Sequence, residues 1–176
     1  MKIFLLIIVI ISSCITSVYA QAPRFQKYSI NDTGYSAYFP ADPGTFENQK
    51  SDDGLNIYTG EVIVDNTNYA IILVLLEDTY KDAPASEIEL LITSYLDFIQ
   101  EQFGINASAG YGKGHTLESH PEAVGVIDYW EDTNGNNYSV KAWADQKALA
   151  VMMVYSKEEI NYNYQTLYLN GFRFKE

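Results

Sequence analysis

One stretch, residues 84–104, constrains the fold of this chain more than any other. Its apolar side chains recur at steps of three and four residues, which places them on one face of an α-helix. Pro84 suits the first turn of such a helix, and Gly104 suits its end. A helix with one apolar face must pack on another layer, and the flanking segments predict a sheet. The apolar positions are Ile88, Leu91, Ile92, Tyr95, Leu96, Ile99 and Phe103.

Strand-like segments lie on both sides of this predicted helix. Residues 69–76 are apolar throughout, which is typical of a central strand covered on both faces. We therefore expect a second layer opposite the helix. Tight-turn pairs such as Asn134-Gly135 predict hairpins, so the sheet should be mainly antiparallel. The predicted strands are residues 25–30, 35–39, 55–64, 69–76, 111–117, 123–130, 137–144, 148–155 and 172–174, and a second helix is predicted over residues 157–169.

The first 20 residues predict an export signal. Lys2 precedes a short apolar run, and Ala20 closes a stretch with small residues at the positions a signal peptidase reads. Cleavage there would leave residues 21–176 as a single domain, periplasmic or extracellular. The apolar run is shorter than the ~20 residues that a permanent membrane span needs, and the mature chain predicts no transmembrane segment. Alternatively, residues 11–14 resemble a lipoprotein box, in which Cys14 would be lipidated and anchor the protein to a membrane.

Cysteine content and charge exclude several classes of protein. Cys14 is the only cysteine, so the mature domain has no disulfide and no cysteine ligand or nucleophile. An exported domain without disulfides is typical of the bacterial envelope. The formal net charge is −12, and a surface of that sign repels nucleic acid. We therefore expect an acidic envelope protein that has no nucleic-acid partner.

Two short sequence segments, one near each end of the predicted domain, are informative together with the predicted order of strands and helices. The early one places an aromatic residue before a Phe-Pro-x-x-Pro sequence, and the late one, residues 168–172, loosely matches Phe-x-x-Ser-Phe with Gly171 in the serine position. Together with the order of strands and helices, they resemble the PsbP/Mog1-like superfamily over most of the mature chain. The resemblance implies an α+β fold, a three-layer α/β/α sandwich around a mainly antiparallel sheet. It implies little about activity and transfers no site residue, because one fold hosts many functions. The early segment is matched by Tyr35, Phe39, Pro40 and Pro43.

Both histidines of the chain lie close together in sequence. His115, Glu118 and His120 carry the imidazole and carboxylate groups that bind zinc. Their spacing matches no helical metal motif, and Ser119 and Pro121 indicate a turn that would point His120 away from His115. We expect these three to be surface polar residues, and we expect no metal or other cofactor. They are the candidate ligands if a metal is bound.

Aromatic residues gather on one predicted hairpin. Trp130, Tyr138 and Trp143 would form a sugar- or peptide-binding surface if they were exposed together. Alternatively, they pack across the strands under a helix. The sequence alone favours the packing interpretation.

No catalytic arrangement stands out in the sequence, since no serine or threonine near a histidine lies in a nucleophile-elbow context. We therefore expect a non-enzymatic accessory or protein-binding module of the bacterial cell envelope, with a protein partner. One alternative is a protein that binds a small apolar ligand in a pocket between the long helix and the sheet. Another is a metal-dependent hydrolase that uses His115 and His120.

Overall fold

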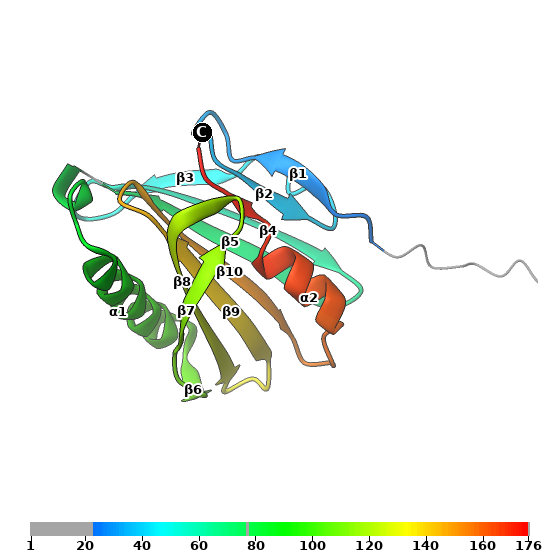
Figure 1. Cartoon of the computed structure of the whole chain (residues 1–176). Helices are drawn as coiled ribbons and strands as arrows, with labels where there is room; N and C mark the ends of the chain where they lie inside the picture. Colours follow the sequence, from blue (N-terminus) through cyan, green and yellow to red (C-terminus); the bar gives the residue numbers. More distant parts are fainter. Residues whose placement is uncertain (1–22, 77, 176) are drawn as a thin grey trace, which may run out of the picture.

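An eight-stranded antiparallel sheet forms the centre of the protein, seen in a computed structural model that describes residues 23–76 and 78–175 (Figure 1). The strand order is β3-β4-β5-β10-β9-β8-β6, and β7 pairs with β8 beside β6. All of these pairings are antiparallel, as the hairpin turns predicted. The strands are β3 (Glu47–Lys50), β4 (Asn56–Val64), β5 (Thr67–Leu75), β6 (Ile105–Ser108), β7 (Gly112–Leu117), β8 (His120–Asp132), β9 (Asn137–Ala144) and β10 (Ala148–Ser156).

The predicted long helix, α1 (Ala85–Phe103), covers one face of this sheet over β8 and β9 (Figure 1). It ends at Gly104, whose φ of 64° lies in the left-handed region that glycine adopts without a steric penalty. Its apolar stripe is buried against side chains of β8, β9 and β10. The helix predicted from the sequence is therefore confirmed to within one residue at each end. The buried residues of the apolar stripe are Ile88, Ile92, Leu96 and Ile99.

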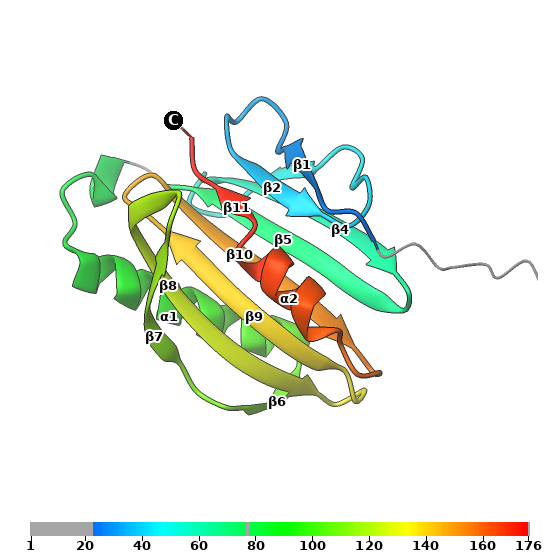
Figure 2. The ribbon, with the colours of Figure 1, turned by 45° about the vertical axis from the view of Figure 1, so that its right-hand side comes forward.

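A three-stranded antiparallel sheet and a short helix cover the opposite face (Figure 2). The sheet has the order β1-β2-β11, and the helix α2 packs mainly over β10. Their apolar side chains share one buried cluster with those of β5, β9 and β10. The elements of this layer are β1 (Gln26–Ser29), β2 (Ser36–Phe39), α2 (Tyr162–Leu169) and β11 (Phe172–Arg173), and a short 3₁₀ helix, η1 (Asp78–Tyr80), precedes α1.

The predicted three-layer α/β/α sandwich is wrong. The protein is mostly β, with 48% strand and 19% helix, and its described part contains two sheets and two α-helices. The layer opposite α1 is largely the small sheet, because residues from both ends of the chain pair there through β2 and β11. The helix in that layer is also shorter than predicted, since Asn161 caps it and α2 begins at Tyr162 rather than at residue 157.

Two strands at the edges of the large sheet were not predicted. All residues of β3 are exposed and polar, and β6 is mostly exposed. Edge strands of this kind lack the alternation of apolar and polar residues that marks a half-buried strand. The predicted signal peptide, with cleavage at Ala20, and the alternative lipidation at Cys14 lie outside the described residues.

Candidate functional site

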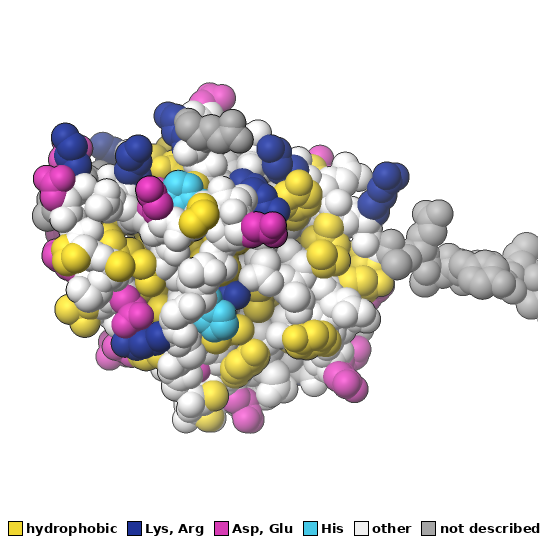
Figure 3. All heavy atoms as spheres, in the orientation of Figure 1, with side chains coloured by type: hydrophobic (Ala, Val, Ile, Leu, Met, Phe, Trp, Pro, Cys, Tyr) yellow, Lys and Arg dark blue, Asp and Glu magenta, His cyan; other side chains and the backbone are white. Residues whose placement is uncertain are grey.

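The structure gives the two histidines different surroundings. Figure 3 shows the two imidazoles, in cyan, apart on one face of the molecule. His115 lies on β7, half-buried, where burial lowers its pKa and the cation of Lys141 lowers it further. His120 begins β8, and its ring stacks on Phe174 at 4.4 Å between centroids. Glu118 is exposed in the turn between the two strands.

No described group of three or more His, Cys, Asp or Glu side chains is arranged to hold a metal ion. The partner of His120 is a single carboxylate, with 3.3 Å between Nε2 and the Asp145 Oδ2 atom. The structure therefore does not bring His115, Glu118 and His120 together as one cluster.

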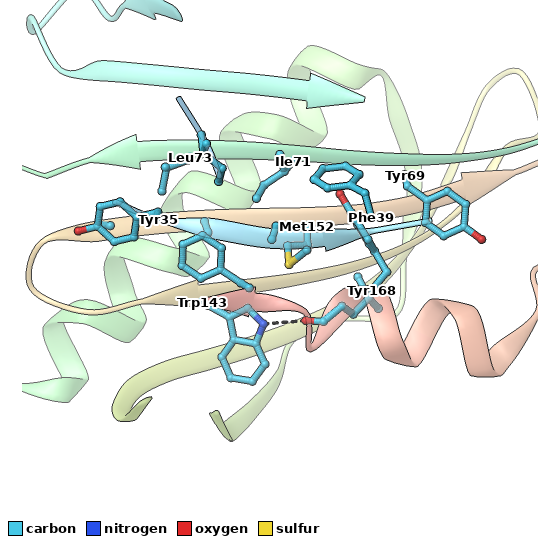
Figure 4. Close-up of a cluster of buried hydrophobic side chains, with 14 of the residues drawn as sticks. Tyr35, Phe39, Tyr69, Ile71, Leu73, Trp143, Met152 and Tyr168 are labelled. Carbon is cyan, nitrogen blue, oxygen red and sulfur yellow. Dashed lines mark hydrogen bonds between the residues drawn. The ribbon is translucent and has the colours of Figure 1, made fainter. Parts of the chain in front are cut away.

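The three aromatic side chains of the β8–β9 hairpin do not form one exposed surface. Trp130 pairs with Tyr138 across the hairpin on the α1 face, with exposures of 3% and 5%. Trp143 lies on the other face and is fully buried. Figure 4 shows its indole Nε1 donating to the main-chain carbonyl of Leu169, at 2.7 Å, which ties the end of α2 to the sheet. These contacts agree with the interpretation that the three aromatic side chains pack within the protein rather than form an exposed binding surface.

Along the middle of α1, the space between the helix and the sheet beneath it is filled by side chains. Ile92 and Leu96 are fully buried there, against Val126 and Val140. A cavity of about 570 Å³ lies beside the end of the helix, lined by Phe103 and by residues of β3, β4, β5 and β10. A smaller hollow of about 430 Å³ lies between the first turn of α1 and β8, and charged side chains contribute much of its lining. The pocket for an apolar ligand between the helix and the sheet stays a prediction.

A larger groove lies on the opposite face, between α2, β2 and the turn that joins β7 to β8. We call it the α2 groove; it has a volume of about 640 Å³. Its apolar lining comes from Phe25, Tyr38, Leu117 and Leu167, and the Leu167 side chain is 56% exposed. Asn170, Ser119 and Glu118 supply polar groups to the lining. An exposed apolar groove of this kind is typical of a binding surface.

A second hollow adjoins the α2 groove and shares Ser119 and Arg173 with it. We call it the cationic hollow, because its lining includes Lys27, Arg173 and Lys175 beside His120, and no acidic side chain among residues 23–76 and 78–175. It gathers three of the eleven lysine and arginine residues of a chain that carries 23 acidic ones. Such a concentration of cations on an acidic protein favours an anionic ligand.

Arg173 is held in place at the junction of the two hollows. Its Nη1 atom donates to the main-chain carbonyls of Asn170, at 2.9 Å, and Phe172, at 2.7 Å. Its guanidinium carbon lies 5.0 Å from the centroid of the Tyr38 ring, a cation–π contact. A fixed guanidinium loses little conformational entropy when it binds a carboxylate, so Arg173 is prepared to recognise an anion.

Sequence patterns gave no sign of this site. Lys27 comes from the first strand, whereas Arg173 and Lys175 come from residues near the other end of the chain, so no single run of cations marks the hollow. In comparisons with protein-family models and with curated proteins, no match to this chain was found. None of the described helices is long and apolar enough to cross a membrane.

Proposed function

We propose that this protein is an exported, non-enzymatic accessory module of the bacterial cell envelope that binds a protein partner through the α2 groove and the cationic hollow. The observation that carries the proposal is the contact between the two hollows at Ser119 and Arg173. One is lined mainly by apolar side chains, and the other is lined by cations. Their combination fits an acidic segment of a partner that also carries an apolar side chain.

The two hollows would bind different parts of such a segment. An apolar side chain of the partner would cover Phe25 and Leu167 in the α2 groove, where removal of apolar surface from water favours association. A carboxylate of the same segment would pair with Arg173 or with Lys27 and Lys175. The net charge of −12 works against other acidic partners elsewhere on the surface, so the cationic hollow also supplies specificity.

A labelled peptide that alternates glutamate with phenylalanine and leucine tests this proposal. Its affinity would be measured by fluorescence anisotropy at low ionic strength, with a lysine-for-glutamate peptide as the comparison. The test variant is Lys27→Gln with Lys175→Gln, and the matched control is Lys50→Gln with Lys157→Gln, which removes the same charge from exposed lysines outside both hollows.

The test variant should bind the acidic peptide about 2- to 30-fold more weakly, since exposed charge pairs contribute about 0.2–1 kcal/mol each. The control should bind like the wild type. Leu167→Gln should weaken binding through the α2 groove, and Glu118→Gln should strengthen it by removing a like charge from the lining. Equal affinities for the test and control variants, or no binding of the acidic peptide, would contradict the proposal.

A further inference from the structure

Lys141 is a buried cation without a carboxylate partner in the described part of the chain. It lies on β9, on the face covered by α2, and its side chain is 7% exposed. Neither of the ion pairs among the described residues includes it. Burial lowers the pKa of Lys141, because the charged amine is separated from water. A buried charge without a counter-charge is costly, so its presence calls for a physical reason.

The amine is held in one orientation beside the α2 groove. Nζ of Lys141 donates to Oδ1 of Asn170 at 2.9 Å and lies 4.5 Å from the centroid of the Trp143 ring. The Asn170 side chain is itself fixed, since its Nδ2 donates to the carbonyl of Thr166 at 2.9 Å. An ammonium group has three donors, and Asn170 uses one of them. Asn170 lines the α2 groove, so the amine lies one hydrogen bond behind the wall of the groove.

A second basic group, His115 on β7, lies on the same side of the sheet. Its Cβ and the Trp143 ring both lie against Gly125, at 2.8 Å and 2.3 Å from the position that an added Cβ would take, and the Lys141 amine lies over the same Trp143 ring. Burial lowers the pKa of His115, and the Lys141 cation lowers it further. The amine supplies the positive charge here, and the imidazole, which the lowered pKa keeps neutral, can donate one N–H hydrogen bond. A carboxylate beside them would supply the missing counter-charge.

We propose that Lys141, His115 and Asn170 form an anion subsite beside the α2 groove that takes a carboxylate side chain of the bound partner. The inference rests on the proposed function and extends it. One acid of the partner would occupy the cationic hollow, a second would reach Lys141, and the apolar side chain would lie in the groove between them. The preferred segment would therefore carry an acid on each side of an apolar residue.

Lys141→Met provides the first test. Methionine is unbranched and apolar, so the variant removes the buried charge. The Asn170 Oδ1 atom loses its donor, but Asn170 is only half-buried at the groove, where the oxygen can accept from water. The melting temperature should therefore equal or exceed that of the wild type. Its affinity for the glutamate-containing peptide should fall at least about tenfold, because truncating one partner of a buried charge pair is costly. Lys147→Met, a change at an exposed lysine outside both hollows, is the matched control and should alter the affinity less than about twofold.

Lysine side-chain NMR of the wild-type protein provides the second test, with acetate as the probe and sodium chloride at equal ionic strength as the control. The ε-carbon signal of Lys141, assigned by its loss in Lys141→Met, should shift with acetate and saturate. If Lys141→Met binds the peptide as tightly as the wild type does, the inference is overturned while the proposed function stands. If the wild type binds no peptide, the proposed function fails, and the acetate titration alone decides the inference. A Lys141 signal that does not move, or that moves equally with sodium chloride, overturns it.

Discussion

The buried hydroxyl of Tyr168 offers a sharp test of how the core is packed. Tyr168 is fully buried on α2, with its ring in edge contact with Phe39 at 5.2 Å and Tyr69 at 5.3 Å (Figure 4). Among the described residues its hydroxyl has no hydrogen-bond partner. Burial raises the pKa of Tyr168 well above 10, so the hydroxyl stays protonated at neutral pH. Tyr168→Phe keeps the ring and removes only the unpaired polar group.

The expected change in stability follows from two opposing effects. A buried hydroxyl without a partner costs about 1–3 kcal/mol. Its removal leaves a void of about one methyl group, which costs about 1 kcal/mol. The net effect is a gain of about 1 kcal/mol in the free energy of unfolding, or roughly 2–4 °C in melting temperature for a chain of this size. Urea unfolding at pH 7, followed by tryptophan fluorescence, measures it.

Tyr138→Phe is the matched control, because it removes a buried hydroxyl that does have a partner. That hydroxyl donates to the Oδ2 atom of Asp132 at 3.1 Å, and losing a hydrogen bond to a charged group should cost about 1.5–3 kcal/mol. The two substitutions are therefore expected to have opposite signs. A loss of stability in Tyr168→Phe would refute the reasoning, since it would mean that the hydroxyl is hydrogen-bonded in solution.

Three further predictions concern the packing of the sheet, the start of α2 and the turn that follows β8. Gly125→Ala should destabilise the protein by about 1–3 kcal/mol in urea unfolding, because the added Cβ would lie 2.3 Å from Cζ3 of Trp143, and an unchanged midpoint would contradict this. Asn161→Ala removes the side chain that caps α2 and should cost about 0.5–2 kcal/mol in the same assay, whereas an unaltered stability would show that the cap contributes nothing. Burial alone would raise the pKa of Asp132, but hydrogen bonds from neighbouring side chains and main-chain groups lower it to about 2, below the ordinary 3.8. Between these two pKa values the unfolded state binds more protons, so the contribution of Asp132 to stability is complete above about pH 4 and is lost as the pH falls toward 2. Asp132→Asn should therefore be less stable at pH 7 and should lose less stability in acid than the wild type does. Parallel profiles of stability against pH for the two proteins would contradict this prediction.

The two hollows could not be predicted from the sequence, but the placement of the aromatic candidates on the β8–β9 hairpin could. Within a hairpin, side chains alternate between faces, so the register set by Asn134-Gly135 already places Trp130 and Trp143 on opposite sides. Burial of Trp143 beneath α2 could not be read in this way, because it depends on a helix that follows another strand. The same holds for Lys141, whose surroundings come from β7 and α2.

The sequence by itself determined the local elements of this protein. Apolar spacing defined α1 and turn chemistry defined the hairpins, because both signals act between residues close together in the chain. Only the tertiary structure decided that β2 and β11 pair across most of the chain length, which replaces a helical layer by a second sheet. That pairing also brings Lys27 beside Arg173 and Lys175, and so creates the cationic hollow. Contacts between distant segments depend on which surfaces pack together, and no local pattern of residues records that choice.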